Sequence, residues 1–407
     1  MSNFTNSFLH NLSLPPHGKY DIYQDDKIKG LSLRVSSKGK KSFFTRSRVK
    51  GEPIIIKYGS FPEITVQQAR TKTHEALNLI SLGINPNKHS NEVKYKNITL
   101  IQVLDDYIKS RGTNLKDNTA KNYRGTFTYL NDWSNKTMLS ISRDMVEQRH
   151  RDITYGIGKF KSSPTRANTV MRLLRALFNY AMGEYEDAQG HPIVLHNPTK
   201  RLSHVKAWNR EKRKQTIIKD YDLKAWWKAV HVLPNHQLNN KQPNHSETAR
   251  DFFIFVLMTG LRRREASTLM WSNIDFKDRS LTIEDTKNYE THSLPLTDYL
   301  VDLLSKRKAQ SASLFVFEGN NPSKPMNDPK KQVAKVREIS KVYFNIHDLR
   351  RTFITIAESL DTPSYTLKAL MNHKDPRDVT SGYIIKSIDR LRKPMNEIGD
   401  YILEQVK

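Results

Sequence analysis

The 407-residue sequence predicts a mainly helical chain with small β-sheets, an α+β fold divided into three domains. Three observations support this prediction. Leu31-Ser-Leu-Arg-Val35 alternates apolar and polar side chains, which is typical of a strand, and further strand candidates surround it within residues 17–60. From residue 97 onwards, apolar side chains recur at the three- and four-residue spacing of amphipathic helices. A polar stretch at 85–97 and a Gly- and Pro-marked, basic stretch at 190–216 separate these regions.

The first domain, residues 1–90, is predicted to be a small sheet with one helix. Lys38-Gly39 and Lys50-Gly51 supply turns, and Thr65 and Gly83 are the start and stop signals of the helix. The expected elements are strands at 31–35, 42–49 and 54–58 and a helix at 66–82. The stretch 85–97 is interpreted as a polar linker because it is rich in Asn, Lys, His and Ser.

The second and third domains are predicted from residue 97 onwards. Residues 97–185 are expected to be all-helical, with helices at 100–110, 119–133, 142–154 and 163–184. Residues 199–216 form a basic connector. Residues 217–407 are expected to be α-rich, with strands inserted at 274–276, 281–283 and 293–295.

The charge balance points to an acidic polymer as partner. The chain has 67 Lys and Arg against 42 Asp and Glu, a formal net charge of +25, and each of the three regions is net basic. Basic side chains that neutralise phosphates release counterions and so strengthen binding to nucleic acid.

No window approaches the apolar length of a membrane span, and the start lacks the pattern of a secretory signal. The absence of cysteine excludes disulfides, Cys-ligated zinc and a thiol nucleophile. We therefore expect a cytoplasmic protein that works on nucleic acid and not on a membrane.

The strongest chemical signals lie in the third region. Thr259-Gly-Leu-Arg262 places an arginine directly after a helix break, and Glu265 follows one turn later. The pair His347-x-x-Arg350 comes some 85 residues on, and the last members of the set are His373 and Tyr383. Each of these signals occurs by chance in many proteins. Their joint order and spacing makes the set specific.

This arrangement is similar to that of the tyrosine recombinase (phage integrase) family, and the similarity extends over nearly the whole chain. The stretch from Thr286-Lys287 to Pro295-Leu resembles the β-hairpin that carries the lysine of the family. Residues 97–185 are similar to its core-site-binding domain, and residues 17–90 resemble the arm-binding domain of integrases from mobile islands. One departure is Asn372, which stands where the family usually has Gly before the histidine. Because Asn tolerates left-handed backbone, we expect this turn to be kept.

The resemblance implies roles that also make chemical sense. Cleavage of a phosphodiester by a tyrosine builds negative charge on the non-bridging oxygens, and the fixed guanidinium groups of Arg262 and Arg350 suit that charge. The phenol of Tyr383 has an ordinary pKa near 10. It therefore needs a nearby positive field and a base, for which His347 beside Arg350 is the candidate.

The remaining members of the set would complete the reaction. Lys287 would protonate the leaving 5′-oxygen, His373 would donate a hydrogen bond to the phosphate, and Glu265 would orient the site without reacting. The product would be a 3′-phosphotyrosyl link that conserves bond energy for rejoining. The resemblance implies no metal and no cofactor.

The resemblance implies a site-specific integrase of a mobile element or prophage. Its expected partners are double-stranded DNA with core and arm-type attachment sites, further copies of the chain in a homo-tetramer, a host DNA-bending protein and a directionality factor. Candidate arm contacts are the basic side chains of the predicted sheet, Arg34, Arg46, Arg48 and Lys57. Two alternatives stay open: a type IB topoisomerase-like DNA relaxer, which uses the same residues on one duplex, and a catalytically silent DNA-binding regulator. The additional arm-like and clamp-like domains favour recombination over relaxation.

The C-terminal segment predicts a helix with one apolar stripe, interrupted at Pro394. The stripe consists of Ile388, Leu391, Met395, Ile398 and Ile402. In the family this segment packs on a neighbouring protomer. Folding back onto its own domain is equally compatible with the sequence.

Overall fold

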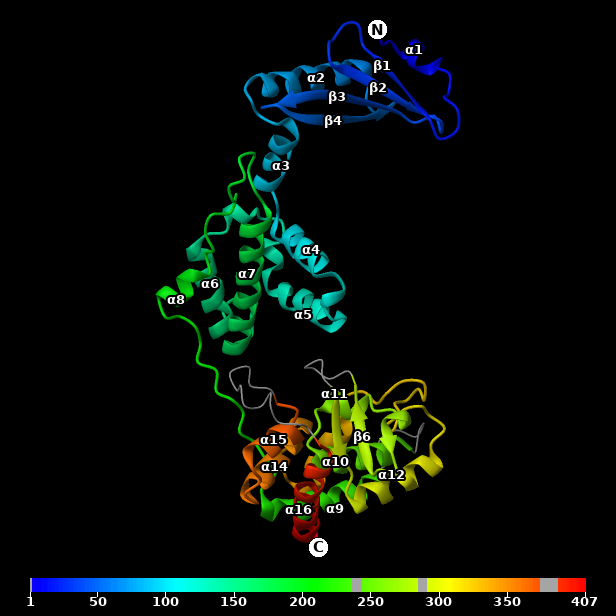
Figure 1. Cartoon of the computed structure of the whole chain (residues 1–407). Helices are drawn as coiled ribbons and strands as arrows, with labels where there is room; N and C mark the ends of the chain where they lie inside the picture. The colour runs from blue at the N-terminus through cyan, green and yellow to red at the C-terminus, as the bar shows by residue number, and fades with distance from the viewer. Residues whose placement is uncertain (1, 236–243, 285–290, 374–386) are drawn as a thin grey trace. The chain divides into compact units, whose positions relative to one another are not determined.

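The computed structural model describes residues 2–235, 244–284, 291–373 and 387–407. These residues are mostly helical, with two small antiparallel sheets, which confirms the predicted mainly-α, α+β fold (Figure 1). The chain divides into two compact units, residues 1–212 and 213–407. The first unit contains two separate hydrophobic cores, one in the sheet region and one in the helices that follow. The division into three domains remains a prediction.

The sheet region is a four-stranded antiparallel meander with a helix on one face. Leu31, Leu33 and Val35 alternate inward and form its core with Phe43 and Ala69. The elements are α1 (Asn6–His10), β1 (Tyr20–Gln24), β2 (Leu31–Ser36), β3 (Lys41–Val49), β4 (Glu52–Phe61) and α2 (Val66–Ser81). The short helix α1 was not predicted, and it packs Leu9 into the same core.

The predicted polar linker at 85–97 is wrong, because the segment forms helix α3 (Pro86–Lys96). Asn85 caps its start by accepting a hydrogen bond from the Asn87 amide at 3.0 Å, and Pro86 occupies the first helical position. Lys96 pairs with Glu92 one turn earlier at 2.6 Å. Polar composition concealed these helix signals.

The helical region of the first unit has its own core around α7. Leu174, Leu177 and Phe178 of α7 are fully buried against helices before it in the chain. The elements are α4 (Leu100–Arg111), η1 (Gly112–Asn114), α5 (Asp117–Phe127), η2 (Thr128–Trp133), η3 (Met138–Ser140), α6 (Arg143–Tyr155), α7 (Pro164–Glu184) and α8 (Lys200–His204). Short 3-10 turns replace the last part of the helix predicted at 119–133.

The second unit is α-rich with a three-stranded sheet, as predicted. Helix α10 forms its centre, since Phe252 to Met258 are all buried, and α14 packs beside it. The helices are α9 (Asp220–Val232), η4 (Leu233–Asn235), α10 (Asn244–Thr259), α11 (Arg263–Ser267), η5 (Trp271–Asn273), α12 (Asp298–Gln310), α13 (Lys330–Ser340), α14 (Ile346–Ser359), α15 (Ser364–Leu370) and α16 (Asp389–Val406). The strands are β5 (Ile274–Asp275), β6 (Ser280–Ile283) and β7 (His292–Pro295).

The C-terminal helix α16 runs through Pro394 without a break, so the predicted interruption is wrong. Pro394 lies in the second turn of the helix, and the apolar side chains beyond it hold the helix against its own unit. Met395, Ile398 and Ile402 are fully buried, and α16 contacts α9, α10 and β7. In this structure the stripe therefore packs in cis. No described helix is long and apolar enough to span a membrane.

Candidate active site

Arg262 stands at the break between α10 and α11, where its backbone and side chain are both fixed by Glu265. The Glu265 carboxylate accepts a hydrogen bond from the Arg262 amide at 3.1 Å and another from Arg262 Nη1 at 2.8 Å. Glu265 is 7% exposed, whereas Arg262 is only half-buried. A buried carboxylate thus orients a guanidinium group that remains accessible to a ligand. This geometry agrees with the orienting role expected for Glu265.

Arg350 on α14 is the most constrained charged group of the site. It is 3% exposed; Nη1 donates to the Gly260 carbonyl at 2.5 Å, and Nη2 donates to the Met371 carbonyl at 2.8 Å. Nη2 also lies 3.1 Å from His373 Nε2. Burial, and after it the charge of Arg262, lower the pKa of Arg350 to about 10, so the group stays protonated at neutral pH. The Arg350 guanidinium group therefore connects three segments: the break between α10 and α11 at Gly260, helix α14, and the turn after α15.

His347 lies in the first turn of α14, and its side chain is exposed. Asn345 caps this helix by accepting a hydrogen bond from the His347 amide at 3.0 Å. Partial burial and then the charges of Arg351 and Arg350 lower the pKa of the imidazole. The ring is therefore neutral at neutral pH, which is the protonation state that a general base requires.

His373 follows a turn that ends α15 and that accommodates Asn372. The His373 amide donates to the Lys368 carbonyl at 2.9 Å, and the Asn372 amide donates to the Ala369 carbonyl at 3.1 Å. Asn372 has a φ of 45°, as the left-handed position of this Schellman motif requires. The expectation that Asn keeps the turn is confirmed. Because Arg350 can only donate, His373 Nε2 accepts its hydrogen bond, and the proton of the neutral ring lies on Nδ1.

Asp348 is a functional residue that the sequence interpretation missed. It is fully buried; one carboxylate oxygen accepts from the Asn345 amide at 2.9 Å, and the other accepts from Thr216 Oγ1 at 2.7 Å and from Arg351. The helix that carries His347 and Arg350 is thereby tied to the segment before α9. The spacing Asn345-x-x-Asp348, an N-cap followed by an acidic residue at the third helical position, was the available signal.

His292, the first residue of β7, is the second residue that was missed. Its side chain is 4% exposed and lies within reach of the charges of Glu265, Arg350 and Arg262. Burial is the main cause that lowers the pKa of His292 to about 4. The inward orientation follows the alternation of β7, in which His292 and Leu294 are buried and Ser293 between them is half-buried.

The buried neutral ring of His292 predicts a loss of stability in mild acid. The His292 ring binds a proton near pH 6.5 in the unfolded chain and only near pH 4 in the folded chain. The contribution of this ring to stability is therefore fully present above pH 6.5 and is lost as the pH falls towards 4. Each pH unit below 6.5 costs about 1.4 kcal/mol, or about 2 kcal/mol at pH 5. Urea unfolding at pH 7 and pH 5 measures this loss, and His292→Leu should reduce it. An unchanged pH dependence in this variant would contradict the assignment.

Gly260 is predicted to tolerate no side chain. Its φ is +63°, and a Cβ atom there would lie 2.6 Å from Met371 Cε and 2.7 Å from Phe353 Cδ1. Gly260→Ala should lower the free energy of unfolding by on the order of 2 kcal/mol or more. Urea unfolding checks this, with Gly125→Ala as the control, because a Cβ at Gly125 meets no atom within 4 Å. Equal stability of Gly260→Ala and the wild type would contradict the packing described here.

The four candidate arm contacts share one face of the N-terminal sheet. Strand register pairs Ser32 with Phe44 and Phe44 with Lys57, so these three side chains point to the same face. Arg34 lies two residues after Ser32, and Arg46 lies two residues after Phe44, so both arginines point to that face as well. The buried residues of the core, such as Leu33, point to the opposite face, which α2 covers.

All four basic side chains, Arg34, Arg46, Arg48 and Lys57, are exposed. The Arg34 guanidinium lies 3.9 Å from the centre of the Tyr20 ring, and that of Arg46 lies 5.5 Å from the centre of the Phe44 ring. The face is therefore basic with aromatic side chains between the charges.

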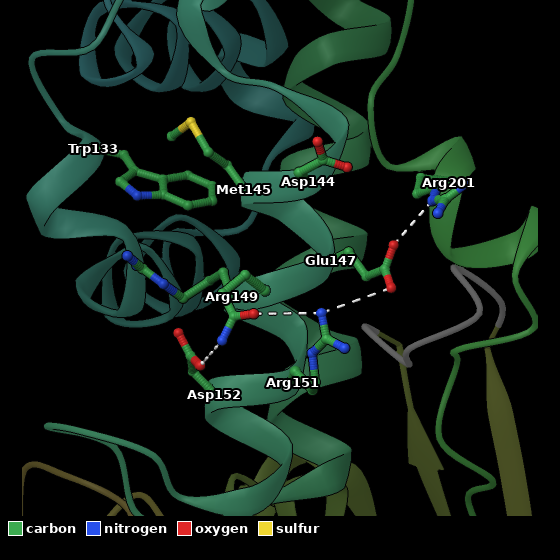
Figure 2. A pocket seen from close by; sticks show the side chains of 9 residues that line it. Trp133, Asp144, Met145, Glu147, Arg149, Arg151, Asp152 and Arg201 are labelled. Atoms are coloured by element: carbon green, nitrogen blue, oxygen red, sulfur yellow. Dashed lines mark hydrogen bonds and ion pairs between the residues drawn. The ribbon is translucent and has the colours of Figure 1, made fainter.

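A polar pocket of about 600 Å³ opens along α6 in the helical region (Figure 2). Figure 2 shows Glu147 between Arg151 and Arg201, at 3.8 and 2.9 Å. The charged side chains that line the pocket are balanced, three acidic and three basic: Asp144, Glu147, Asp152, Arg149, Arg151 and Arg201. Because it contains none of the predicted catalytic residues and no excess positive charge, we assign it no part in phosphate chemistry.

Lys287 and Tyr383 lie outside the described residues, so the structure brings together four of the six predicted catalytic residues, Arg262, His347, Arg350 and His373. Within the described ranges, no group of three or more His, Asp or Glu side chains could hold a metal ion. Two oriented guanidinium groups beside two neutral imidazoles are side chains of the kind that phosphate binding and proton transfer next to a phosphate require.

Comparison with known proteins agrees with this class of site. The phage integrase family matches residues 235–388, and the arm DNA-binding domain matches residues 4–93. A prophage integrase of Escherichia coli, IntF, is 25% identical over 99% of this chain and 91% of its own length. A lambda integrase dimer bound to a core site has a similar fold, with a TM-score of 0.53 and 17% identity over 89% of this chain and 95% of that one. A lambda integrase tetramer bound to a Holliday junction also has a similar fold, with a TM-score of 0.52 and 18% identity over 85% of this chain and 96% of that one.

The fold and the family matches thus define a DNA-binding enzyme. The chain belongs to the phage integrase family, the tyrosine recombinases that cut and rejoin DNA, and it carries an N-terminal arm DNA-binding domain.

Proposed function

We propose that this chain integrates or excises a mobile genetic element by cleaving DNA through Tyr383 and rejoining it from a 3′-phosphotyrosyl intermediate. The observation that carries the proposal is the environment of Arg350. Its buried guanidinium group is held by Gly260, from the motif that contains Arg262, and by Met371 and His373 at the last motif, so that all three motifs, with Arg350 from the second, meet here. Such fixation positions a positive charge before the substrate arrives, which is the arrangement that stabilises a charged transition state.

The described side chains support a separate chemical role for each residue. Arg350 uses three of its five N–H donors in these contacts, which leaves two for the non-bridging oxygens of the phosphate. Arg262, oriented by Glu265, supplies the second guanidinium group. His347, neutral and exposed, accepts the proton of the attacking phenol, and His373 donates to the phosphate through Nδ1. Tyr383 as nucleophile and Lys287 as proton donor to the 5′-oxygen follow from the resemblance.

The basic face of the N-terminal sheet is proposed to bind arm-type sites on DNA. Replacing Arg46 and Arg48 together by Ala should weaken arm-site binding and reduce the slope of log Kd against log salt by about two, since each lost phosphate contact removes about one. Filter binding across salt concentrations measures the slope. Lys72→Ala on α2 is the control, because α2 covers the opposite face of the sheet. A slope unchanged in the double variant would contradict the assignment.

We further propose that the chain works on DNA in the bacterial cytoplasm as a homo-tetramer that spans two core sites, with a host DNA-bending protein and a directionality factor as partners. The lambda integrase tetramer on a Holliday junction, which has a similar fold, supports the tetrameric state. No cofactor is proposed.

A plasmid assay tests recombination against the two alternatives. A supercoiled plasmid carrying two candidate attachment sites is incubated with the protein and EDTA, beside a plasmid with one site. Recombinant circles or Holliday junctions from the two-site plasmid alone are the expected products. Relaxation of both plasmids without recombinants would identify a topoisomerase-like enzyme. Tight binding with neither product would identify a regulator.

A further inference from the structure

Arg34 occupies a central place on the basic face of the N-terminal sheet. The strand order is β1-β2-β3-β4, so β2, which carries Arg34, is an inner strand with a neighbour on each side. Arg34 pairs with Ile22 of β1 and with Ser42 of β3, and its own side chain is exposed. Directly paired residues share a face of the sheet, so an apolar and a small polar side chain flank the guanidinium group, and neither carries a charge.

The other three cations of this face lie nearer to its margins. Strand β2 pairs with β3 only as far as Thr45, so Arg46 and Arg48 belong to the part of the sheet where only β3 and β4 remain. Lys57 lies on β4, which is an edge strand. When strands enter a groove of DNA, the middle of the inserted face meets the base edges, whereas its margins meet the two phosphate backbones. The position of Arg34 therefore favours contact with a base.

The guanidinium group of Arg34 is held by an aromatic ring. It lies over the ring of Tyr20, 3.9 Å from the ring centre. Such a contact orients the planar group without using its N–H donors. Among the described residues, none accepts a hydrogen bond from this side chain or forms an ion pair with it. All five N–H donors of an oriented fork thus remain for a ligand.

The marginal cations are held less firmly. Arg46 lies 5.5 Å from the centre of the Phe44 ring, and Phe44 is itself only 6% exposed. Arg48 and Lys57 lie over no aromatic ring in the part of the chain that the structure describes. A side chain that is free to move can follow a phosphate over a range of positions. An oriented guanidinium group loses less freedom on binding and suits two acceptors at a fixed spacing, such as O6 and N7 of guanine.

We propose that Arg34, oriented by the Tyr20 ring, reads one guanine of the arm-type site through bidentate hydrogen bonds to O6 and N7 in the major groove. Arg46, Arg48 and Lys57 contact phosphates. The inference rests on the arm-site binding proposed above and adds the side chain that determines sequence specificity. The major groove of B-DNA, about 12 Å wide, admits strands, and O6 with N7 is the acceptor pair that guanine presents there.

The probe is a short duplex that carries one arm-type site. It is taken from the part of the element's attachment DNA whose footprint by the full chain is lost in the double variant Arg46→Ala and Arg48→Ala. Each guanine is replaced singly by 7-deazaguanine, which lacks the N7 acceptor. In a matched series each guanine is replaced by inosine, which keeps O6 and N7 and lacks only the amino group in the minor groove.

Wild-type protein should bind one 7-deazaguanine duplex about tenfold more weakly than the parent, because one bond of a bidentate pair is lost. It should bind the inosine duplex for the same position as tightly as the parent. A wild type that discriminates no 7-deazaguanine duplex from the parent would overturn the proposal. So would an inosine penalty equal to the 7-deazaguanine penalty at that position, since it would indicate a contact in the minor groove.

Arg34→Ala should show no penalty at the 7-deazaguanine position that the wild type discriminates. Its affinity for the parent duplex should fall by about tenfold to a hundredfold. Arg48→Ala is the matched control, because loss of a phosphate contact should weaken binding to every duplex by the same factor and keep the full penalty. An Arg34→Ala variant that keeps the wild-type penalty at every guanine would overturn the proposal.

Two variants of Tyr20 test the orienting role of its ring. Tyr20→Leu removes the ring and keeps an apolar side chain, whereas Tyr20→Phe keeps the ring. The penalty should shrink in Tyr20→Leu and be retained in Tyr20→Phe. Because the penalty compares two duplexes bound by one protein, a change in the folded fraction cancels. A full wild-type penalty in Tyr20→Leu would overturn the role of Tyr20.

The footprint separates failure of this inference from failure of the proposed function. If no footprint depends on Arg46 and Arg48, arm-site binding by this face fails, and the inference fails with it. If the footprint depends on them but no guanine shows a penalty that Arg34→Ala removes, arm-site binding stands and the guanine contact alone fails. Arg34 is then a further phosphate contact if its loss reduces the slope of log Kd against log salt by about one.

Discussion

Replacing Tyr383 by Phe is expected to abolish the covalent protein–DNA complex while leaving DNA binding unchanged. The substitution removes only the phenolic oxygen, which is the proposed nucleophile, and no other group in the set can form a stable ester with the 3′-phosphate. A nicked duplex carrying a candidate core site, incubated with EDTA and run on a denaturing gel, measures the complex. The loss should exceed about a thousandfold, because removal of a nucleophile leaves only binding and positioning.

Tyr401→Phe is the matched control for this experiment. Tyr401 lies on α16 of the same unit, and its hydroxyl bonds Asp220 at 3.0 Å, so its loss removes an ordinary tyrosine contact. This variant should form the complex as wild type does. A band that persists in Tyr383→Phe would show that another residue attacks the DNA. No band from the wild type with any candidate site, despite tight binding, would favour a regulator.

Replacing Arg350 by Lys is expected to reduce the cleavage rate constant by about a thousandfold, although the positive charge is kept. The guanidinium group binds the Gly260 and Met371 carbonyls and His373 at the same time and still has donors for phosphate. An ammonium group is a point charge with three donors and lacks this planar fork. The fall in the cleavage rate constant of Arg350→Lys therefore reports the hydrogen-bonding geometry of the guanidinium group and not its charge. Single-turnover cleavage on the nicked duplex is the assay.

The neighbouring Arg351 supplies the control for this second prediction. Arg351 is half-buried on the same helix and pairs with Asp348. Arg351→Lys keeps the charge beside Asp348 and should retain cleavage within about tenfold of the wild type, as expected for a structural ion pair that is partly exposed. Thermal unfolding of both variants separates loss of activity from loss of fold. Equal effects at the two positions would contradict the special role of Arg350.

The parts of the site that could be predicted from sequence depend on local patterns. A Thr-Gly break before Arg262 predicts the helix boundary, and Glu265 one turn later predicts the contact between them, because residues three apart on a helix are neighbours. The left-handed position of Asn372 follows from the conformational tolerance of asparagine. Strand alternation likewise places Arg34 and Arg46 on the exposed face of the sheet.

The missed residues depend on contacts between distant segments. Asp348 binds Thr216, 132 residues earlier, and His292 is buried within reach of the charges of Glu265 and Arg350. The capping signal of Asn345 and Asp348 predicts only the local contact. The contacts with distant segments cannot be read from the sequence, because they arise only when the strands and helices pack. Helix α3 was missed for a different reason. The Asn85-Pro86 start signal was present, but polar composition was given more weight than capping.

The measurement that tests the central claim most directly is identification of the residue that becomes linked to DNA. Wild-type protein trapped on a nicked core site is digested with protease and nuclease, and the nucleotide-bearing peptide is sequenced by mass spectrometry. The account predicts a single modified peptide with the nucleotide attached through its 3′-phosphate to Tyr383. Attachment to another residue, or through a 5′-phosphate, would contradict it.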